Sequence, residues 1–223
     1  MTDDLSTNPR IEIRSTLAEK VHPSRVALVI IDMQNDLLHP EGKAAIGGGR
    51  DTGAAWSIVP ALQKLLAKAR EHNILTIHVQ ATTLPEQVSG SGPWLDSRSR
   101  ATFSTPDICV DGTWGQQTIE ELAPAGAEPI VKKYRYSAFP GTSLDLILRS
   151  NMIETVITAG VSTNACVEAT AREAFSNNYY VVYPADCVAS WSKHLHDATL
   201  ETAAHRYAVV CDSTEIAKEW DAA

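Results

Sequence analysis

The sequence predicts an α/β fold of three layers, in which helices cover both faces of a mostly parallel sheet of about six strands. Two patterns predict it. Apolar runs such as residues 26–31 are nearly continuous, which is typical of strands buried on both faces. These runs alternate along the chain with segments of helical periodicity, which favours right-handed crossovers between parallel strands.

The expected elements follow in chain order. The predicted strands cover residues 26–31, 74–79, 129–131, 154–159, 179–183 and 207–210. The predicted helices cover residues 58–71, 116–122, 142–149, about 165–177, about 193–205 and 214–220, with Ser213 as the cap of the last one. Residues 81–112 are irregular and rich in Gly, Ser and Pro, and loops of this length are often functional.

The composition of the chain indicates how many domains to expect, which partners are disfavoured and in which compartment the protein is expected. Residues 1–24 are polar and read as an N-terminal arm, and residues 25–223 read as a single domain with one large core. The net charge of −8 argues against nucleic acid or an anionic membrane as a partner. Membrane-length apolar runs and a secretory signal are absent from the sequence, and the four cysteines lack paired or metal-ligand spacing. We therefore expect free thiols in the cytoplasm.

Cys166 is the first candidate for chemistry. It follows the apolar run 154–159 and a turn of small residues, at the start of an Ala-rich helical pattern. A cysteine at a helix N-terminus faces unpaired N–H groups and the positive end of the helix dipole, which favour the thiolate. The same N–H groups are suited to stabilise an oxyanion.

Two further polar positions also end predicted strands. Asp32 directly follows the run 26–31, and Lys132 and Lys133 follow the strand at 129–131. Because ligands bind at the carboxyl ends of parallel strands, we expect Asp32, one of the two lysines and Cys166 to converge. Asp32 is then a candidate general base, and the lysine a cation beside the nucleophile. The alternatives are an Asp that bonds loop N–H groups and a solvated lysine pair.

Three motifs in this order resemble the isochorismatase-like cysteine hydrolases, whose fold has a Rossmann-like topology: LVIIDMQND at 28–36, KYRYSAF at 133–139 and GVSTNACV at 160–167. The resemblance covers roughly residues 25–212. It implies a catalytic triad of Asp32, Lys133 and Cys166 and a cis peptide between Val161 and Ser162. It also implies an oxyanion hole made by the backbone N–H groups of Ser162 and Cys166.

Departures within the superfamily narrow the predicted reaction. Members that cleave a vinyl ether lack the nucleophilic cysteine, so Cys166 argues against that reaction. Nicotinamidases carry an Asp/His/His metal site after the second strand, where this chain has His78 without a DxH pattern. We expect no metal and no cofactor, because one His is too few ligands for zinc. His78 then reads as a strand residue bonded to backbone.

The remaining members hydrolyse linear amides and ureides, such as ureidoacrylate, biuret and N-carbamoylsarcosine. The resemblance therefore predicts a cysteine amidohydrolase that acts on a small amide or ureide through an acyl-thioester. It also implies a homo-oligomer, dimer or tetramer. The alternatives are a nicotinamidase-like amidase without the metal site, and a non-catalytic scaffold homologue. A nucleotide-binding oxidoreductase is disfavoured because no Gly-rich fingerprint follows residues 26–31.

Substrate contacts are expected mainly from the loops. Arg98 and Arg100 are candidates for a substrate carboxylate, or for loop carbonyls. A loop Trp more commonly anchors packing than lines a pocket, and a His at a helix start is by default solvated. With those alternatives, the candidate pocket residues are Gln80, Trp94, Trp114, Tyr136, Phe139, Trp191 and His194.

Overall fold

A computed structural model describes residues 11–100, 105 and 107–223 of the chain. Within these residues seven parallel strands form one sheet in the order β3-β2-β1-β4-β5-β7, with β6 paired to β4. The predicted α/β class and parallel sheet are confirmed. The strands are β1 (Val26–Ile31), β2 (Leu75–Ala81), β3 (Ile130–Lys133), β4 (Thr155–Val161), β5 (Tyr180–Pro184), β6 (Val188–Ala189) and β7 (Val209–Cys211).

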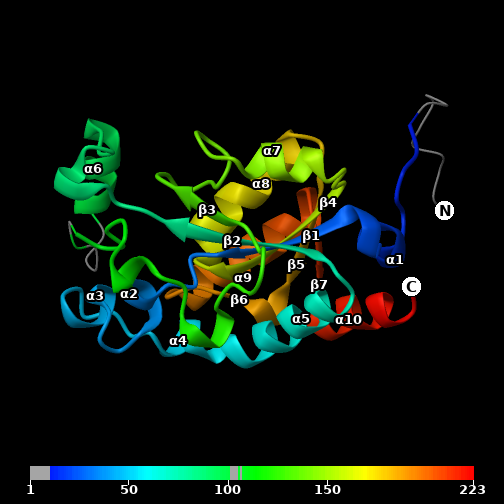
Figure 1. Ribbon diagram of the computed structural model, residues 1–223, viewed down its shortest axis with the longest axis horizontal. Coiled ribbons are helices and arrows are strands. Elements are labelled where there is room, and N and C mark those ends of the chain that lie inside the picture. The colour runs from blue at the N-terminus through cyan, green and yellow to red at the C-terminus, as the bar shows by residue number, and fades with distance from the viewer. Residues whose placement is uncertain (1–10, 101–104, 106) are drawn as a thin grey trace.

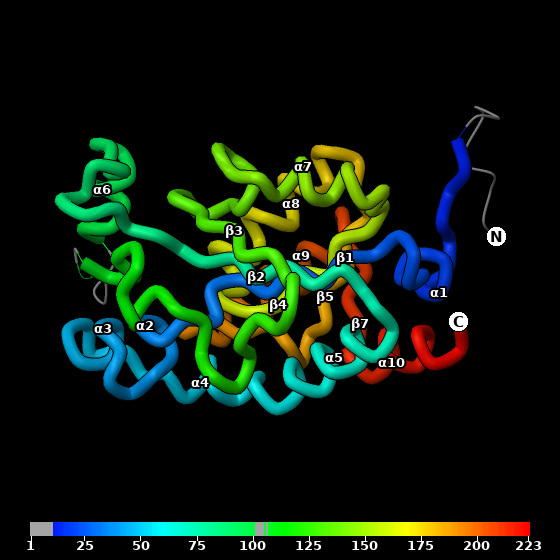
Figure 2. The backbone as a smooth tube through the Cα atoms, in the orientation of Figure 1, coloured from blue at the N-terminus to red at the C-terminus, as the bar shows by residue number. Residues whose placement is uncertain are grey.

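Helices cover both faces of the sheet (Figure 1). α5 (Val59–Glu71) and α10 (Ser213–Asp221) lie on one face, and α7 (Leu144–Ser150), α8 (Glu168–Ser176) and α9 (Lys193–Arg206) lie on the other. The tube in Figure 2 shows β1 and β4 running through the middle of these layers.

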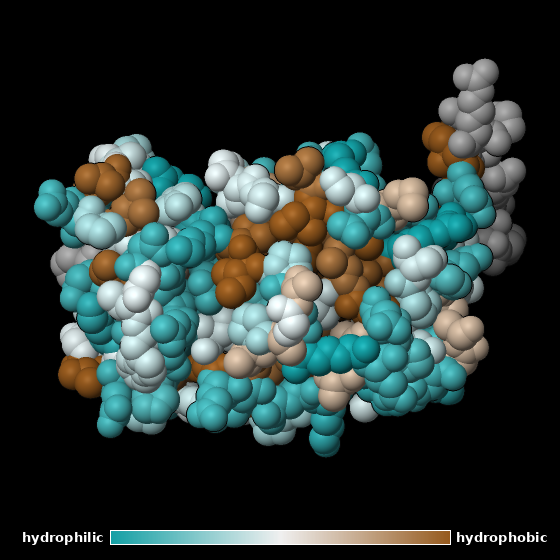
Figure 3. All heavy atoms as spheres, in the orientation of Figure 1, coloured by the Kyte–Doolittle hydropathy of each residue, from teal (hydrophilic) through white to brown (hydrophobic). Residues whose placement is uncertain are grey.

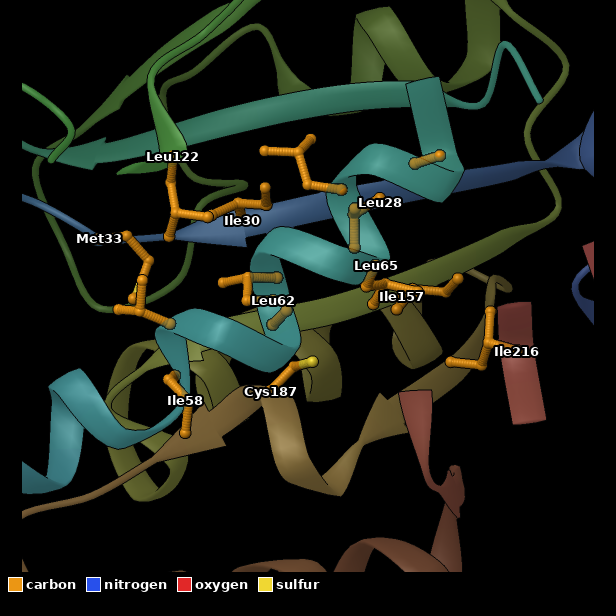
Figure 4. Packing of buried hydrophobic residues seen from close by; sticks show 14 of the residues in the cluster. Leu28, Ile30, Met33, Ile58, Leu62, Leu65, Leu122, Ile157, Cys187 and Ile216 are labelled. Atoms are coloured by element: carbon orange, nitrogen blue, oxygen red, sulfur yellow. The ribbon is translucent and has the colours of Figure 1, made fainter. Parts of the chain in front are cut away.

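β1 is a continuous apolar run because both of its faces are buried. Leu28 and Ile30 pack with Leu62 and Leu65 of α5 in one core cluster (Figure 4). The alternate residues of β1 belong to the cluster on the other face, under α7 and α8. Every residue of β1 is buried, so the strand holds its carboxyl end rigidly in the centre of the sheet.

Short elements fill the connections, and several differ from the sequence prediction. They are α1 (Leu17–Lys20), η1 (Pro23–Arg25), α2 (Asn35–Leu38), α3 (Lys43–Ile46), α4 (Gly53–Ser57), η2 (Pro85–Gln87), α6 (Gly92–Ser99), η3 (Trp114–Gln116), η4 (Glu120–Leu122), the π-helix η5 (Thr163–Val167) and η6 (Ala185–Cys187). The predicted helix at 116–122 is wrong. Gln117 is extended there and Thr118 pairs with Gln34, which separates two short 3-10 turns.

The part of the predicted N-terminal arm that the structure describes packs partly against the domain. α1 contacts α10, Val21 is fully buried, and the indole Nε1 of Trp220 donates a 2.8 Å hydrogen bond to the carbonyl of Val21. Residues 1–10 of the predicted arm lie outside the described residues.

Gly160 allows the carboxyl ends of β1 and β4 to approach each other. Its φ is +110°, a conformation that favours glycine, and a Cβ there would lie 2.1 Å from the carbonyl oxygen of Ile31. The two residues are partners in the parallel register of the strands. The turn that leads to Cys166 therefore begins directly beside the end of β1.

The face of the molecule shown in Figure 3 has both apolar and polar areas. On the face shown in Figure 3, apolar atoms gather over β2, β3 and α7, and polar residues cover the side of α5 and α10. None of the helices in the described residues has the length and apolar character needed to cross a membrane.

A polar cluster joins β2 to the loop before β3. The Glu128 carboxylate accepts hydrogen bonds from Arg70 Nε at 2.8 Å and from the Ala125 amide at 2.9 Å, and it pairs with His78 Nε2 at 2.9 Å. Burial raises the pKa of Glu128, but these partners outweigh it and lower the pKa from 4.5 to about 2. The folded state therefore binds this proton less readily than the unfolded state does.

Glu128→Gln is expected to lower the free energy of unfolding by about 3 kcal/mol at pH 7, as linkage converts the pKa difference. The contribution of Glu128 is present above pH 4.5 and is lost as the pH falls toward 2. Urea denaturation at pH 7 and at pH 3 measures it, with Glu201→Gln on the exposed face of α9 as the control. Equal stability of Glu128→Gln and the natural sequence at pH 7 would contradict this reading of the cluster.

Candidate active site

Asp32 stands directly after β1 at the carboxyl edge of the sheet. Its φ of +55° turns the side chain away from the strand direction, and the residue is 2% exposed. The amide of Ala81, the last residue of the neighbouring β2, donates to Asp32 Oδ1 at 3.0 Å. This bond fixes one carboxylate oxygen and leaves Oδ2 for a second partner.

Lys133 supplies that partner from the end of β3. Its Nζ lies 2.9 Å from Asp32 Oδ2 and 3.2 Å from Cys166 Sγ, and it donates to the carbonyl of Arg135 at 3.1 Å. The lysine is 2% exposed, like the aspartate. Lys132 points to the other face, where it pairs with Asp111 at the surface. The choice between the two lysines, open in the sequence, is decided by the alternation of side chains along β3.

Cys166 lies in η5, between the end of β4 and α8. The peptide bond between Val161 and Ser162, at the start of this turn, is cis. Thr170 of α8 donates to the carbonyl of Cys166 at 2.7 Å, and the amide of Ala138, in the segment after β3, donates to the same threonine hydroxyl at 3.1 Å. The backbone at Cys166 is thus tied through Thr170 to the segment that follows β3.

The electrostatics of the three side chains differ from the sequence expectation. Burial, together with the charge of Asp32, raises the pKa of the Cys166 thiol from 9.0 to about 12, against the lowering effect of Lys133. Burial lowers the pKa of Lys133, but the negative charges of Asp32 and Cys166 outweigh it and the net direction is upward. Cys166 is therefore a thiol at neutral pH beside the Asp32–Lys133 ion pair, and the helix N-terminus, which favours the thiolate, is outweighed by burial and by the charge of Asp32.

A cavity of about 400 Å³ opens in front of this group. Asp32, Lys133, Ser162 and Cys166 all line it. Three of the predicted substrate contacts also line it, namely Trp94, Tyr136 and Trp191. Trp94 and Tyr136 meet edge to face, with ring centroids 5.0 Å apart, so they form one aromatic part of the wall.

The structure places the other four predicted contacts outside the described lining of this cavity. Gln80 is buried in β2, where its amide bonds the hydroxyl of Thr118. Phe139 packs against Tyr179 in the core, and Trp114 meets His39 at the surface. His194 is exposed in the first turn of α9. Trp114 and His194 therefore have the packing and solvated roles described as their alternatives, and Gln80 and Phe139 are buried residues that support the fold.

Several lining residues carry no role in the sequence analysis. Arg50 follows the Gly47–Gly49 turn, and Arg135 lies inside the KYRYSAF motif. Asn164 accepts hydrogen bonds from the hydroxyls of Ser190 at 2.5 Å and Ser162 at 3.3 Å. Cys109 is a free, buried cysteine that also lines the cavity. For Arg50 and Arg135, the sequence feature that could have indicated a place in the cavity wall is an arginine beside glycines or aromatic residues in a loop.

His78, at the position where the metal site of nicotinamidases was considered, is a buried residue of β2. Its ring pairs with the carboxylate of Glu128 instead of the expected backbone group. It is not among the described residues that line the cavity.

The sequence and the fold of this chain are similar to those of known proteins. The family model of the isochorismatase domain matches residues 26–215. The chain belongs to the isochorismatase family. The resemblance carried by the three motifs is thus confirmed for the family.

Individual proteins are similar to this chain over most of their length. The ureidoacrylate amidohydrolase RutB of Pseudomonas syringae pv. syringae is 33% identical over 181 residues, which cover 75% of this chain and 71% of that protein. A cysteine hydrolase from Pseudomonas syringae pv. phaseolicola superposes with a TM-score of 0.81 at 25% identity, over 91% of this chain and 95% of the other. The N-carbamoylsarcosine amidase from Thermoplasma acidophilum gives 0.67 at 27% identity, over 85% and 96%.

Proposed function

We propose that the chain hydrolyses the C–N bond of a small linear amide or ureide through a thioester on Cys166. The chain is a hydrolase of amide C–N bonds, as its family and its amidohydrolase relatives indicate. The observation that carries the cysteine mechanism is Lys133 Nζ, which lies within 3.2 Å of both Asp32 Oδ2 and Cys166 Sγ. A buried base, a cation and a thiol meet at the wall of one cavity.

In the first half-reaction, the Cys166 proton passes to Asp32 as the sulfur attacks the carbonyl carbon. Because the thiol pKa is raised to about 12, this transfer accompanies the attack, and Lys133 stabilises the negative charge on sulfur. The N–H groups of Ser162 and Cys166 are the donors proposed for the oxyanion, each worth about 3 kcal/mol in the transition state. Asp32 then protonates the departing nitrogen, and the C–N bond breaks.

In the second half-reaction, water hydrolyses the thioester. Asp32, again a carboxylate, takes the proton of the attacking water. The C–S bond breaks, the carboxylate or carbamate product forms, and the proton returns to the Cys166 sulfur. The sum of both halves is hydrolysis of one amide bond by one water molecule, and the steps above use no cofactor.

The test is a screen for ammonia release over N-carbamoyl amino acids, 3-ureidoacrylate, biuret, nicotinamide and simple aliphatic amides. Hits are quenched in acid, and the intact mass is measured for an acyl adduct that maps to Cys166. Turnover with an adduct at that residue supports the proposal. Amide turnover that survives without Cys166 would contradict it, and the absence of any amide turnover would favour a scaffold homologue.

The homo-oligomer implied by the resemblance stays a prediction. Light scattering coupled to size-exclusion chromatography measures it, and a monomer at micromolar concentration would contradict it.

A further inference from the structure

The two strand ends beside Cys166 each carry a serine. β4 and β6 are parallel neighbours, and their last paired residues are Val161 and Ala189. The next residue after each strand is a serine, Ser162 after β4 and Ser190 after β6, and both line the cavity. Because neighbouring parallel strands end at the same edge of a sheet, the two hydroxyls lie close together at the cavity wall.

The side-chain amide of Asn164 bridges these serines through its oxygen. Its Oδ1 accepts hydrogen bonds from the Ser190 hydroxyl at 2.5 Å and from the Ser162 hydroxyl at 3.3 Å. The Ser190 oxygen accepts in turn from the backbone amide of Ser192 at 3.2 Å, so this serine is itself held in place. An amide oxygen has two lone pairs, and the two hydroxyls use both. The oxygen end of the Asn164 amide is therefore fully bonded to the protein.

The nitrogen end of the same amide is open. Asn164 lines the cavity, and its Nδ2 makes no hydrogen bond within the described part of the chain. Nδ2 is not one of the buried polar atoms that lack a partner, so it is accessible to solvent. An amide that is anchored at its oxygen and open at its nitrogen presents N–H donors whose direction is fixed before a ligand arrives.

Asn164 lies in η5, the turn that carries the reacting sulfur. It stands two residues after Ser162 and two before Cys166, whose backbone N–H groups are the donors assigned to the oxyanion. The N–H groups of Ala165 and Val167 are engaged elsewhere, because they donate to the carbonyl of Ser162 at 3.0 and 3.2 Å. A further donor from this turn therefore comes from a side chain, and the open amide of Asn164 lies between the two backbone donors in the chain.

We propose that Asn164 Nδ2 donates a third hydrogen bond to the oxyanion that forms when Cys166 attacks the substrate carbonyl. The inference rests on the proposed function, because it adds a catalytic residue to that reaction. No covalent bond of Asn164 changes and no proton leaves Nδ2, since the N–H group only stabilises the charge on the carbonyl oxygen. Because this charge develops in the transition state, the bond raises kcat and has little effect on KM. Ser190 is a positioning residue, since it acts through Asn164.

Asn164→Ala removes this donor without adding a charge. With the best substrate of the screen, kcat is expected to fall about 10²- to 10³-fold, and KM to change by less than about threefold. Alkylation of Cys166 by iodoacetamide forms no oxyanion, so its rate at pH 7 is expected to stay within about twofold of that of the natural sequence. Asn178→Ala is the matched control, because Asn178 is exposed in the turn after α8, and it should retain full turnover.

The outcomes separate a catalytic donor from a structural residue. A parallel loss of hydrolysis and alkylation in Asn164→Ala would mean that the turn has moved, and would overturn the inference. Full turnover in this variant would also overturn it and leave the amidohydrolase proposal standing. Absence of amide turnover in the natural sequence would count against the amidohydrolase proposal itself, and the inference would fall with it.

Asn164→Asp tests which end of the side chain matters. The carboxylate still accepts hydrogen bonds from both serines but has no N–H to donate, so the loss of kcat is expected to be at least as large as in Asn164→Ala. An Asn164→Asp variant as active as the natural sequence would place the role in the oxygen end and overturn the inference.

Ser190→Ala tests the anchor of the amide. It removes the 2.5 Å bond and keeps Nδ2, so kcat is expected to fall about 10-fold, which is less than in Asn164→Ala. Because Ser190 acts through Asn164, the double variant should be no slower than Asn164→Ala alone. Losses that multiply in the double variant would mean that Ser190 works independently of Asn164, and would overturn its role as a positioning residue.

Discussion

Cys166→Ala is expected to abolish amide hydrolysis, with a loss of about 10⁴-fold or more in kcat, because it removes the atom that bonds to the substrate. Cys166→Ser should be almost as inactive, since a hydroxyl is a far weaker acid than a thiol and Asp32 with Lys133 is arranged for sulfur. Both substitutions are small, so the folded structure should persist.

Ammonia release measures the activity of these variants, and circular dichroism measures their folding. Cys211→Ala is the matched control, because this partly buried thiol in β7 is not among the described residues that line the cavity. It should retain full turnover and the adduct on Cys166. Hydrolysis by Cys166→Ala at a rate near that of the control would refute a covalent mechanism on this sulfur.

Most of the fold could be predicted from local pattern. β1 and β4 are buried on both faces, and strands of this kind have mostly apolar sequences, without interruption in β1 and with two threonines in β4. β6 has two residues and α6 lies in a polar loop, so neither has a periodicity to detect. The π-helix η5 is invisible for the same reason, since its form depends on how β4 meets α8.

The convergence of Asp32, Lys133 and Cys166, the three side chains proposed to react, could be predicted because parallel strands end at one edge of the sheet. Their protonation could not be predicted. A helix N-terminus stabilises an anion by at most about 2 kcal/mol. The rise in the Cys166 pKa from 9.0 to about 12 corresponds to about 4 kcal/mol in the other direction. Burial and the Asp32 carboxylate therefore outweigh the helix, and both depend on tertiary contacts.

The cavity wall was predicted only in part, and the reason is geometric. Trp94 of α6, Tyr136 after β3 and Trp191 before α9 line the cavity, whereas Trp114 of η3 and His194 of α9 are exposed to solvent. Arg50 has no signal beyond the glycines before it, and its place on Trp191 joins segments more than a hundred residues apart.

Asp32→Asn is expected to lower hydrolysis about 10³-fold while making Cys166 more acidic. The amide cannot take the proton of the thiol, so the chemical step fails. At the same time the carboxylate charge that raises the Cys166 pKa is gone, and Lys133 at 3.2 Å then favours the thiolate. The variant should therefore react faster with iodoacetamide at pH 7 than the natural sequence does, although it no longer hydrolyses amides.

Lys133→Met should give the opposite result for alkylation and the same result for hydrolysis. Without the ammonium the Cys166 pKa rises further and alkylation slows, and the buried Asp32 carboxylate loses its partner at a cost of about 3–5 kcal/mol in stability. Peptide mass spectrometry after timed iodoacetamide labelling resolves Cys166 from the other thiols. Lys132→Met is the control, because that lysine pairs with Asp111 at the surface. If Asp32→Asn slowed alkylation as Lys133→Met does, the carboxylate would be holding the thiol in place and would not be its base.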